Sequence, residues 1–213
     1  MIVHGYSRSS AAYRLRIALN LKGLDAAFHS VHLRRGDQQS EAYRALNPQG
    51  LVPALETDDG AVLTQSLAII EWLDETHPEP ALLPRDPVGR AHARAFALVI
   101  ACDIHPLQNL RVLRHLKRAL GQDEAGLDAW CRHWIAPGLA ACEALVSREP
   151  GAAFAFGPGP GLAEIVLVPQ MYSADRFGLD LAPYPRLRAL RALCEALPAF
   201  AAAHPSRQPD AEN

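Results

Sequence analysis

Hydroxyl side chains stand at two places where the chain is predicted to pass from a strand into a helix. Ser9 and Ser10 follow the short apolar run of residues 1–3 and begin the first predicted helix. A hydroxyl there can cap the helix, or it can donate to an anion held by the free N–H groups and the helix dipole. Both interpretations stay open. Gln65 and Ser66 begin a later helix in the same way.

A proline inside a predicted strand is the second candidate feature. Pro53 lies within the apolar run of residues 51–57. Proline cannot donate to a sheet ladder, so it belongs at a sheet edge or a strand start. A cis-proline that exposes the backbone of Val52 to an extended, peptide-like ligand is the alternative. The sequence leaves both open.

The elements that position these residues alternate between strand and helix. Apolar runs predict strands at residues 1–3, 26–33, 51–57 and 61–64, and helices at residues 8–21, 41–46 and 67–76. Asp59 and Gly60 form a hairpin signal between the last two strands. The order βαβαββα predicts a small mixed sheet with helices packed on it.

The second half of the chain is predicted to be all helical. Residues 77–87 hold four prolines without helical periodicity, which is typical of a linker. Helical patterns follow at residues 87–120, 124–147, 162–172, 184–197 and 198–203, and Pro106 predicts a kink near residues 103–105. We expect residues 204–213 to be frayed. The predicted domains are residues 1–79 and 87–213, joined by a linker at 80–86.

Composition narrows the class of protein. The 213 residues carry a net charge of -2, which gives no support for a nucleic-acid or membrane partner. No apolar run approaches the roughly 18 residues of a membrane span, and we expect no signal peptide. Four widely spaced cysteines without a CxxC motif indicate free thiols, which favours the cytoplasm. The nine histidines lack metal-binding spacing, so no metal is expected.

Several motifs in the same order resemble the zeta class of the cytosolic glutathione transferases. Residues 8–19 resemble its serine-serine-cysteine signature and the helix that follows, with Ala11 at the cysteine position. Three further stretches resemble its cis-proline segment, its glutathione-carboxylate helix and its helical domain: residues 46–55, residues 65–73, and residues 103–111 with 167–170. The resemblance implies the glutathione transferase fold, an α/β thioredoxin-like N-terminal domain with a mixed four-stranded sheet and an all-α C-terminal domain.

The resemblance also implies glutathione as the cofactor. Ser66 would hold the γ-glutamyl carboxylate through its hydroxyl and backbone N–H, with Gln65 as a further polar contact. An N-cap role for Ser66 is compatible with this. Val52, before Pro53, would pair with the cysteinyl backbone. Further cofactor contacts are implied for His105, Gln108 and Asn109, although His105 could equally be a histidine at a helix bend that backbone groups satisfy.

Catalysis is implied to proceed through the sulfur of glutathione. Ser9 and Ser10 would donate to it, and family precedent favours Ser9. A free thiol titrates near about 8.5, so donors and the positive helix end must favour the thiolate. That thiolate would add to a cis double bond, and elimination after rotation would return glutathione and the trans isomer.

An anionic substrate requires cations. Arg8 and Arg176 match positions that bind substrate carboxylates in the maleylpyruvate-isomerase branch, and Arg111 is a further candidate. Arginine suits this role because its planar fork binds a carboxylate with two hydrogen bonds. An ion pair with Asp175 is the alternative for Arg176.

The function implied is glutathione-dependent cis–trans isomerisation of a small unsaturated dicarboxylate by a homodimer. Maleylacetoacetate is the first expectation for the substrate, and maleylpyruvate is the alternative. A general glutathione S-transferase and a non-catalytic interaction module with the same fold are the rivals. Ser9, Ser10, Pro53 and Ser66 argue against the interaction module, because they would keep a complete ligand site.

Overall fold

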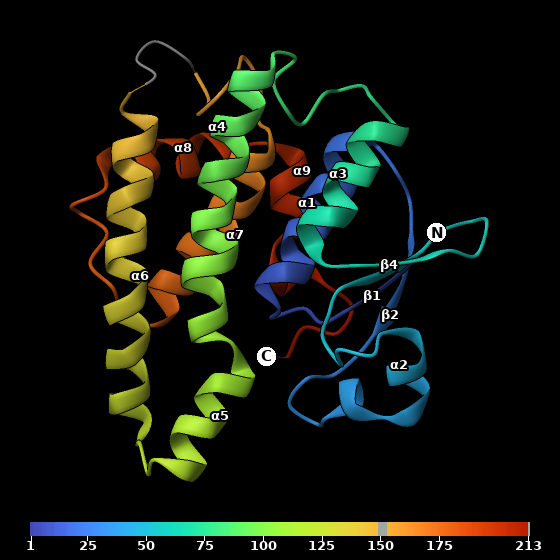
Figure 1. Ribbon diagram of the computed structural model, residues 1–213, viewed down its shortest axis with the longest axis vertical. Coiled ribbons are helices and arrows are strands. Elements are labelled where there is room, and N and C mark those ends of the chain that lie inside the picture. Colours follow the sequence, from blue (N-terminus) through green and yellow to red (C-terminus); the bar gives the residue numbers. More distant parts are fainter. Residues whose placement is uncertain (149–152, 213) are drawn as a thin grey trace. The chain divides into compact units, whose positions relative to one another are not determined.

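The structure, a computed structural model, describes residues 1–148 and 153–212. Contacts divide the chain into two units. The first comprises Met1–Leu82 together with Ala196–Asn213, and the second comprises Leu83–Glu195. The strands belong to the first unit, and the second unit is helical throughout its described regular structure (Figure 1).

A four-stranded mixed sheet forms the centre of the first unit. Its strands are β1 (Ile2–Gly5), β2 (Ala27–Ser30), β3 (Ala54–Glu56) and β4 (Val62–Thr64), in the spatial order β2-β1-β3-β4. β1 is parallel to β2 and antiparallel to β3, and β3 is antiparallel to β4. The predicted mixed sheet is therefore confirmed. Strand β3 is shorter than predicted because it begins after Pro53, which lacks the N–H that a ladder requires.

Three of the helices in this unit are those predicted from the N-terminal half. They are α1 (Ser10–Lys22), α2 (Glu41–Leu46) and α3 (Ser66–Thr76). Helix α1 ends at Gly23, whose φ of 65° is the left-handed conformation that glycine adopts without steric cost. Helices α1 and α3 pack together through a fully buried apolar core of Leu15, Ile17, Ile69, Ile70 and Leu73.

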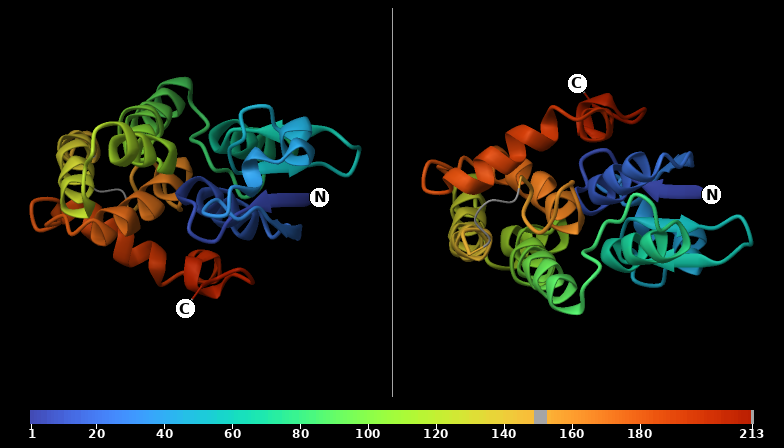
Figure 2. Two further views of the ribbon diagram at one scale, coloured as in Figure 1. Left: turned by 90° about the horizontal axis from the view of Figure 1, so that it is seen from below. Right: turned by 90° about the horizontal axis from the view of Figure 1, so that it is seen from above.

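The C-terminal segment also belongs to the first unit by its contacts. Helix α9 (Pro198–Ala203) packs on α1, and the red C-terminal segment lies on the same side as the blue N-terminal helix in Figure 2. Asn20 on α1 donates to the Ala199 carbonyl at 2.8 Å. The prediction of a frayed tail is wrong for residues 204–212, because polar side chains of this segment bind the sheet end. The predicted domain bounds stay a prediction, and the contacts divide the chain differently at its C-terminal end. Residue 213 and residues 149–152 lie outside the described residues.

The second unit is a group of helices around α7 (Leu162–Arg176). Its other helices are α4 (Pro87–Leu98), α5 (Leu110–Ala119), α6 (Glu124–Val146) and α8 (Pro185–Glu195). Helices α4, α6 and α8 all contact α7, which is buried along most of its length. The strongly apolar sequence of α7 is thus explained by its central place.

The helix predicted at residues 87–120 is divided into separate helices, where the sequence predicted only a kink. A π-helix, η2 (Val99–Ile104), follows α4 and is followed by a 3₁₀-helix, η3 (His105–Gln108), before α5 begins. Pro106 cannot continue an α-helical ladder, which accounts for the break. By length and composition the segment Pro87–Ala119 could cross a membrane, in contrast to the expectation from the sequence. This is weak support for a span, since the core helices of soluble proteins pass the same test.

Candidate functional site

The strand register brings the predicted glutathione residues to one end of the sheet. His4 in β1 pairs with Ala54 at the start of β3, and Ala54 pairs with Thr64 at the end of β4. The chain continues from β1 toward Ser9, enters β3 from Val52 and Pro53, and leaves β4 into Gln65 and Ser66. Three segments that are distant in sequence therefore meet at this end within the first unit: residues 6–10, 51–53 and 65–66.

The turn between β1 and α1 carries Arg8, Ser9 and Ser10. Ser9 is the N-cap of α1, and its Oγ accepts from the Ala12 amide at 3.2 Å. The prediction that Ser9 caps this helix is thus confirmed. A hydroxyl has one proton and two lone pairs, so a capping Oγ keeps its proton for a ligand. Ser10 is the first residue of the helix, and Arg8 is half-buried.

The peptide bond between Val52 and Pro53 is cis, as the second interpretation of Pro53 requires, and the role of Val52 in binding a ligand stays a prediction. The loop before it is held by two side chains that donate to the carbonyl of Leu51. These donors are the Tyr43 hydroxyl at 2.7 Å and the Asn47 amide at 2.8 Å. Val52 itself packs in a buried cluster with Tyr6, Val31 and Tyr43. The segment thereby has a defined position beside the end of β1.

Gln65 and Ser66 begin α3 in an unusual backbone conformation. Gln65 has a φ of 68° and is the non-glycine residue with positive φ in the described chain. Such conformations cost about 1–3 kcal/mol and cluster at ligand sites. The Gln65 side chain donates to Gln49 Oε1 at 2.7 Å. Ser66 is buried at the first position of the helix, where N–H groups lack intrahelical partners.

Helix α1 also carries two buried arginines, Arg14 and Arg16, which were not predicted as site residues from the sequence. Arg14 is 2% exposed, and its guanidinium donates to Ser66 Oγ at 3.4 Å. It places a positive charge directly behind the residue predicted to hold a carboxylate. The signal was present in the sequence, since two arginines stand among the apolar residues of a helix that is otherwise buried.

Arg16 holds the backbone of the turn. Its guanidinium donates to the carbonyls of Ser7 at 3.1 Å, Tyr6 at 3.5 Å and Ala203 at 3.0 Å. Burial lowers the pKa of Arg16 to about 10, and interactions with Tyr13 and Asp210 oppose this shift. The side chain remains charged at neutral pH, so a buried cation joins the turn to the end of α9.

The predicted cofactor contacts of the second unit lie at the break between α4 and α5. His105 begins η3 directly after the π-helix, a feature that is frequent at functional sites. Gln108 is buried and donates to Gln170 Oε1 on α7 at 2.6 Å. Asn109 caps α5, because its side-chain oxygen accepts from the Arg111 amide at 3.1 Å.

Two predicted substrate arginines lie at helix ends of this unit. Arg176 is the last residue of α7 and is exposed, with its guanidinium 5.6 Å from the centre of the Phe177 ring. Asp175, the alternative partner of Arg176, forms an ion pair with Arg191. Arg111 is exposed in the first turn of α5.

The protein's own thiols are poor candidates for chemistry. Cys131, Cys142 and Cys194 are buried free thiols, and burial raises the pKa of Cys131 and of Cys142 to about 12. Cys102 is exposed on the π-helix. The described residues contain no group of three or more His, Cys, Asp or Glu side chains that could hold a metal ion. A reactive sulfur at the sheet end would therefore come from a ligand.

Comparison with known proteins identifies the family. Residues 8–76 match the family model of the glutathione S-transferase N-terminal domain. A maleylpyruvate isomerase of Ralstonia is 50% identical over 211 residues, which is 99% of both chains. A maleylacetoacetate isomerase of Pseudomonas aeruginosa is 50% identical over 212 residues, covering 99% of this chain and 98% of the relative.

Solved structures agree with this assignment. The holo structure of a maleylpyruvate isomerase, described as a bacterial zeta-class glutathione S-transferase, matches with a TM-score of 0.97 and 49% identity, with both chains fully covered. A maleylacetoacetate isomerase of Methylobacterium extorquens with bound malonate and glutathione matches with a TM-score of 0.95 and 41% identity, again over both full chains. Together with the cis-proline and the serine-capped helix at the sheet end, these matches show that the chain belongs to the zeta class of the glutathione S-transferase family.

Proposed function

We propose that the protein is a glutathione-dependent cis–trans isomerase of a small unsaturated dicarboxylate. The observation that carries this proposal is the meeting of three segments at one sheet end: the serine pair, Val52 with its cis-proline, and Ser66 backed by Arg14. Relatives at 50% identity over nearly the whole chain are maleylpyruvate and maleylacetoacetate isomerases. Maleylacetoacetate is the first substrate to test, and maleylpyruvate is the second.

The residues at the sheet end fit the chemistry of glutathione. Its γ-glutamyl carboxylate would bind at the start of α3, through the hydroxyl and N–H of Ser66 with Gln65 beside it. Arg14, whose guanidinium lies 3.4 Å from Ser66 Oγ, adds positive charge there. Val52 would pair with the cysteinyl backbone. His105, Gln108 and Asn109 remain the predicted contacts from the second unit.

When bound, glutathione supplies the sulfur nucleophile that adds to the double bond and later leaves it. The chain's own contribution is to keep that sulfur deprotonated and in position. Ser9 and Ser10 would donate hydrogen bonds to it from the start of α1, where the helix dipole also favours negative charge. Arg8, Arg111 and Arg176 would orient the carboxylates of the substrate, because the guanidinium fork matches a carboxylate in geometry. Relatives with bound malonate and with bound citrate support a site for small acids.

The test is an isomerisation assay that also counts free thiol. Purified protein should convert maleylacetoacetate or maleylpyruvate to its trans isomer only when glutathione is present. The thiol concentration should stay constant over many turnovers, because the cofactor is regenerated. Turnover in glutathione-free buffer would contradict the mechanism. Loss of one glutathione per product would favour a general conjugating transferase instead.

A homodimer in the cytoplasm completes the proposal. Large apolar side chains exposed on α4, Val88 and Leu98, support burial against a partner. The free thiols support a reducing compartment. Light scattering at micromolar concentration should give twice the mass of the chain, and a monomer mass would exclude the dimer.

A further inference from the structure

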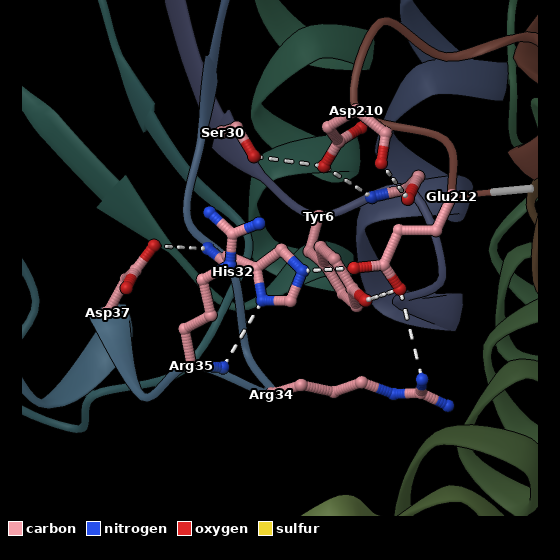
Figure 3. Close-up of polar contacts among 9 residues, drawn as sticks. Tyr6, Ser30, His32, Arg34, Arg35, Asp37, Asp210 and Glu212 are labelled. Carbon is pink, nitrogen blue, oxygen red and sulfur yellow. Dashed lines mark hydrogen bonds and ion pairs between the residues drawn. The ribbon is translucent and has the colours of Figure 1, made fainter.

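The C-terminal tail reaches the same sheet end as the serine turn. After α9, a 3₁₀-helix (Pro205–Arg207) leads into residues 208–212, and the side chains of this stretch contact residues at the ends of β1 and β2 (Figure 3). The contacting acidic residues are Asp210 and Glu212. They bind different kinds of partner, and this difference separates their roles.

Asp210 binds the backbone of the turn. Its Oδ2 accepts from the Ser7 amide at 3.0 Å and from Ser30 Oγ at 3.0 Å. Its own carbonyl accepts from Ser7 Oγ at 3.1 Å. Ser7 is fully buried and stands two residues before Ser9. One tail residue thus satisfies both the amide and the hydroxyl of a residue in the turn.

Glu212 binds only side chains among its described contacts. His32 Nε2 lies 2.6 Å from Oε1, and the Tyr6 hydroxyl donates to Oε2 at 3.4 Å. The Arg34 guanidinium is 3.8 Å from Oε2 (Figure 3). These partners are half-buried or exposed, apart from Tyr6, and the carboxylate is 38% exposed. Glu212 therefore offers a control of equal charge, two residues after Asp210 in the chain.

The turn is held from two sides. Arg16 donates to the carbonyls of Tyr6 and Ser7, while Asp210 accepts from the amide of Ser7. The same guanidinium donates to Ala203, at the end of the helix that precedes the tail. The turn's own bond, from the Ser9 amide to the Tyr6 carbonyl at 3.0 Å, lies between these contacts. The positions of Arg8, Ser9 and Ser10 therefore depend on both ends of the chain.

We propose that Asp210 is a positioning residue for glutathione activation, which acts through Ser7 on the turn that carries Arg8, Ser9 and Ser10. This inference rests on the proposed function for its catalytic consequence. A displacement of about 1 Å at such a group can cost about 100-fold in rate. Asp210 has no part in binding the substrate in this account, and its effect is on the geometry of the donors to sulfur.

The experiment compares Asp210→Ala, Asp210→Asn and the control Glu212→Gln in the full-length protein. Three readouts are needed: amide hydrogen exchange at Ser7, Arg8 and Ser9, pH titration of the bound glutathione thiolate by its ultraviolet absorbance, and kcat for the isomerisation. Asp210→Ala should speed exchange in the turn, raise the pKa of the bound thiol and lower kcat by roughly 10- to 100-fold. Asp210→Asn should retain more activity, because its amide oxygen can still accept from Ser7. Glu212→Gln should match the wild type in all three.

The outcomes separate this inference from the proposed function. Unchanged exchange and an unchanged thiolate titration in Asp210→Ala would overturn the positioning role, as would equal defects in Asp210→Ala and Glu212→Gln. A rise in activity on removal of the carboxylate would also overturn it. If wild-type protein bound no glutathione, the proposed function would fail, while hydrogen exchange would still decide whether Asp210 orders the turn. If Asp210→Ala did not fold, the same readouts on Asp210→Asn would decide.

Discussion

The two units each bury an ionisable side chain for the same structural purpose. In the first unit, the buried cation Arg16 donates to carbonyls of a turn that precedes α1. In the second, the buried carboxyl group of Glu164 accepts from the amides of Ala155 at 2.6 Å and Gly161 at 2.9 Å, in the loop that precedes α7. Each side chain supplies hydrogen-bond partners for backbone groups that have none in a helix or sheet.

The difference lies in what each turn carries. The turn held by Arg16 leads into candidate catalytic serines, and it is also bound by Asp210 from the far end of the chain. The loop held by Glu164 leads into the most buried helix of the second unit. The buried arginine of the first unit therefore serves the candidate site, whereas the buried carboxyl group of the second serves packing. Substitution of Arg16 should therefore affect both stability and activity, whereas substitution of Glu164 should affect stability.

The largest effect is expected at the serine pair. Losing a donor aimed at a developing charge costs about 2.7–4 kcal/mol in a barrier, whereas losing a helix cap costs about 1 kcal/mol of stability. Ser9→Ala and Ser10→Ala should therefore raise the activation free energy by more than they lower the free energy of unfolding. The greater loss of activity is expected for Ser9→Ala. Steady-state kinetics beside thermal unfolding makes the comparison. Full activity in both variants, with a lowered melting temperature in Ser9→Ala, would mean that Ser9 only caps α1 and that neither serine activates the sulfur.

Arg16→Met should have the next largest effect. It keeps much of the side-chain volume but removes the guanidinium that donates to the Ser7 and Ala203 carbonyls, each at a cost of about 1–3 kcal/mol. The expected loss is about 3 kcal/mol of unfolding free energy, measured by urea denaturation. Arg44→Met on the exposed face of α2 is the control and should change stability by less than about 0.5 kcal/mol. Equal, small losses in both would show that Arg16 does not hold the turn.

Glu164→Gln should have the smallest effect on the free energy of unfolding, and this effect should depend on pH. Burial raises the pKa of Glu164, so the native state binds more protons than the unfolded state between the unfolded and native pKa values. Wild-type stability should accordingly fall as pH rises through that window, by about 1.4 kcal/mol per unit of pKa difference. The glutamine variant should lack this fall in stability, because its side chain does not titrate. Parallel stability curves for the two proteins across the window would contradict the assignment.

The sheet and its end were predictable from local patterns. Alternating apolar runs, the Asp59–Gly60 turn and Pro53 specified the strands, and the register then brought Val52 and Ser66 to the end of β1. The break between α4 and α5 followed from Pro106. These signals are local because turn chemistry and strand alternation depend on neighbouring residues.

The buried arginines and the tail were not predictable in the same way. A polar residue such as Asp210 in a proline-containing tail has the composition of a frayed end, and its partner Ser7 stands about 200 positions earlier in the chain. In the sequence, Arg14 and Arg16 are typical of the polar face of an amphipathic helix. In the structure, α3 and α9 pack on α1 and these arginines are buried. Their burial depends on tertiary contacts, which the local sequence does not show.

The central claim is that the start of α3 holds glutathione, independently of the arginines proposed for the substrate. Calorimetric titration of glutathione into Ser66→Ala, with Arg176→Ala as the control, tests it most directly. Loss of a hydrogen bond to a charged group costs about 1.5–3 kcal/mol, so Ser66→Ala should bind roughly 10- to 100-fold more weakly than wild type. Arg176→Ala should bind as wild type does. Undiminished affinity in Ser66→Ala would contradict the account.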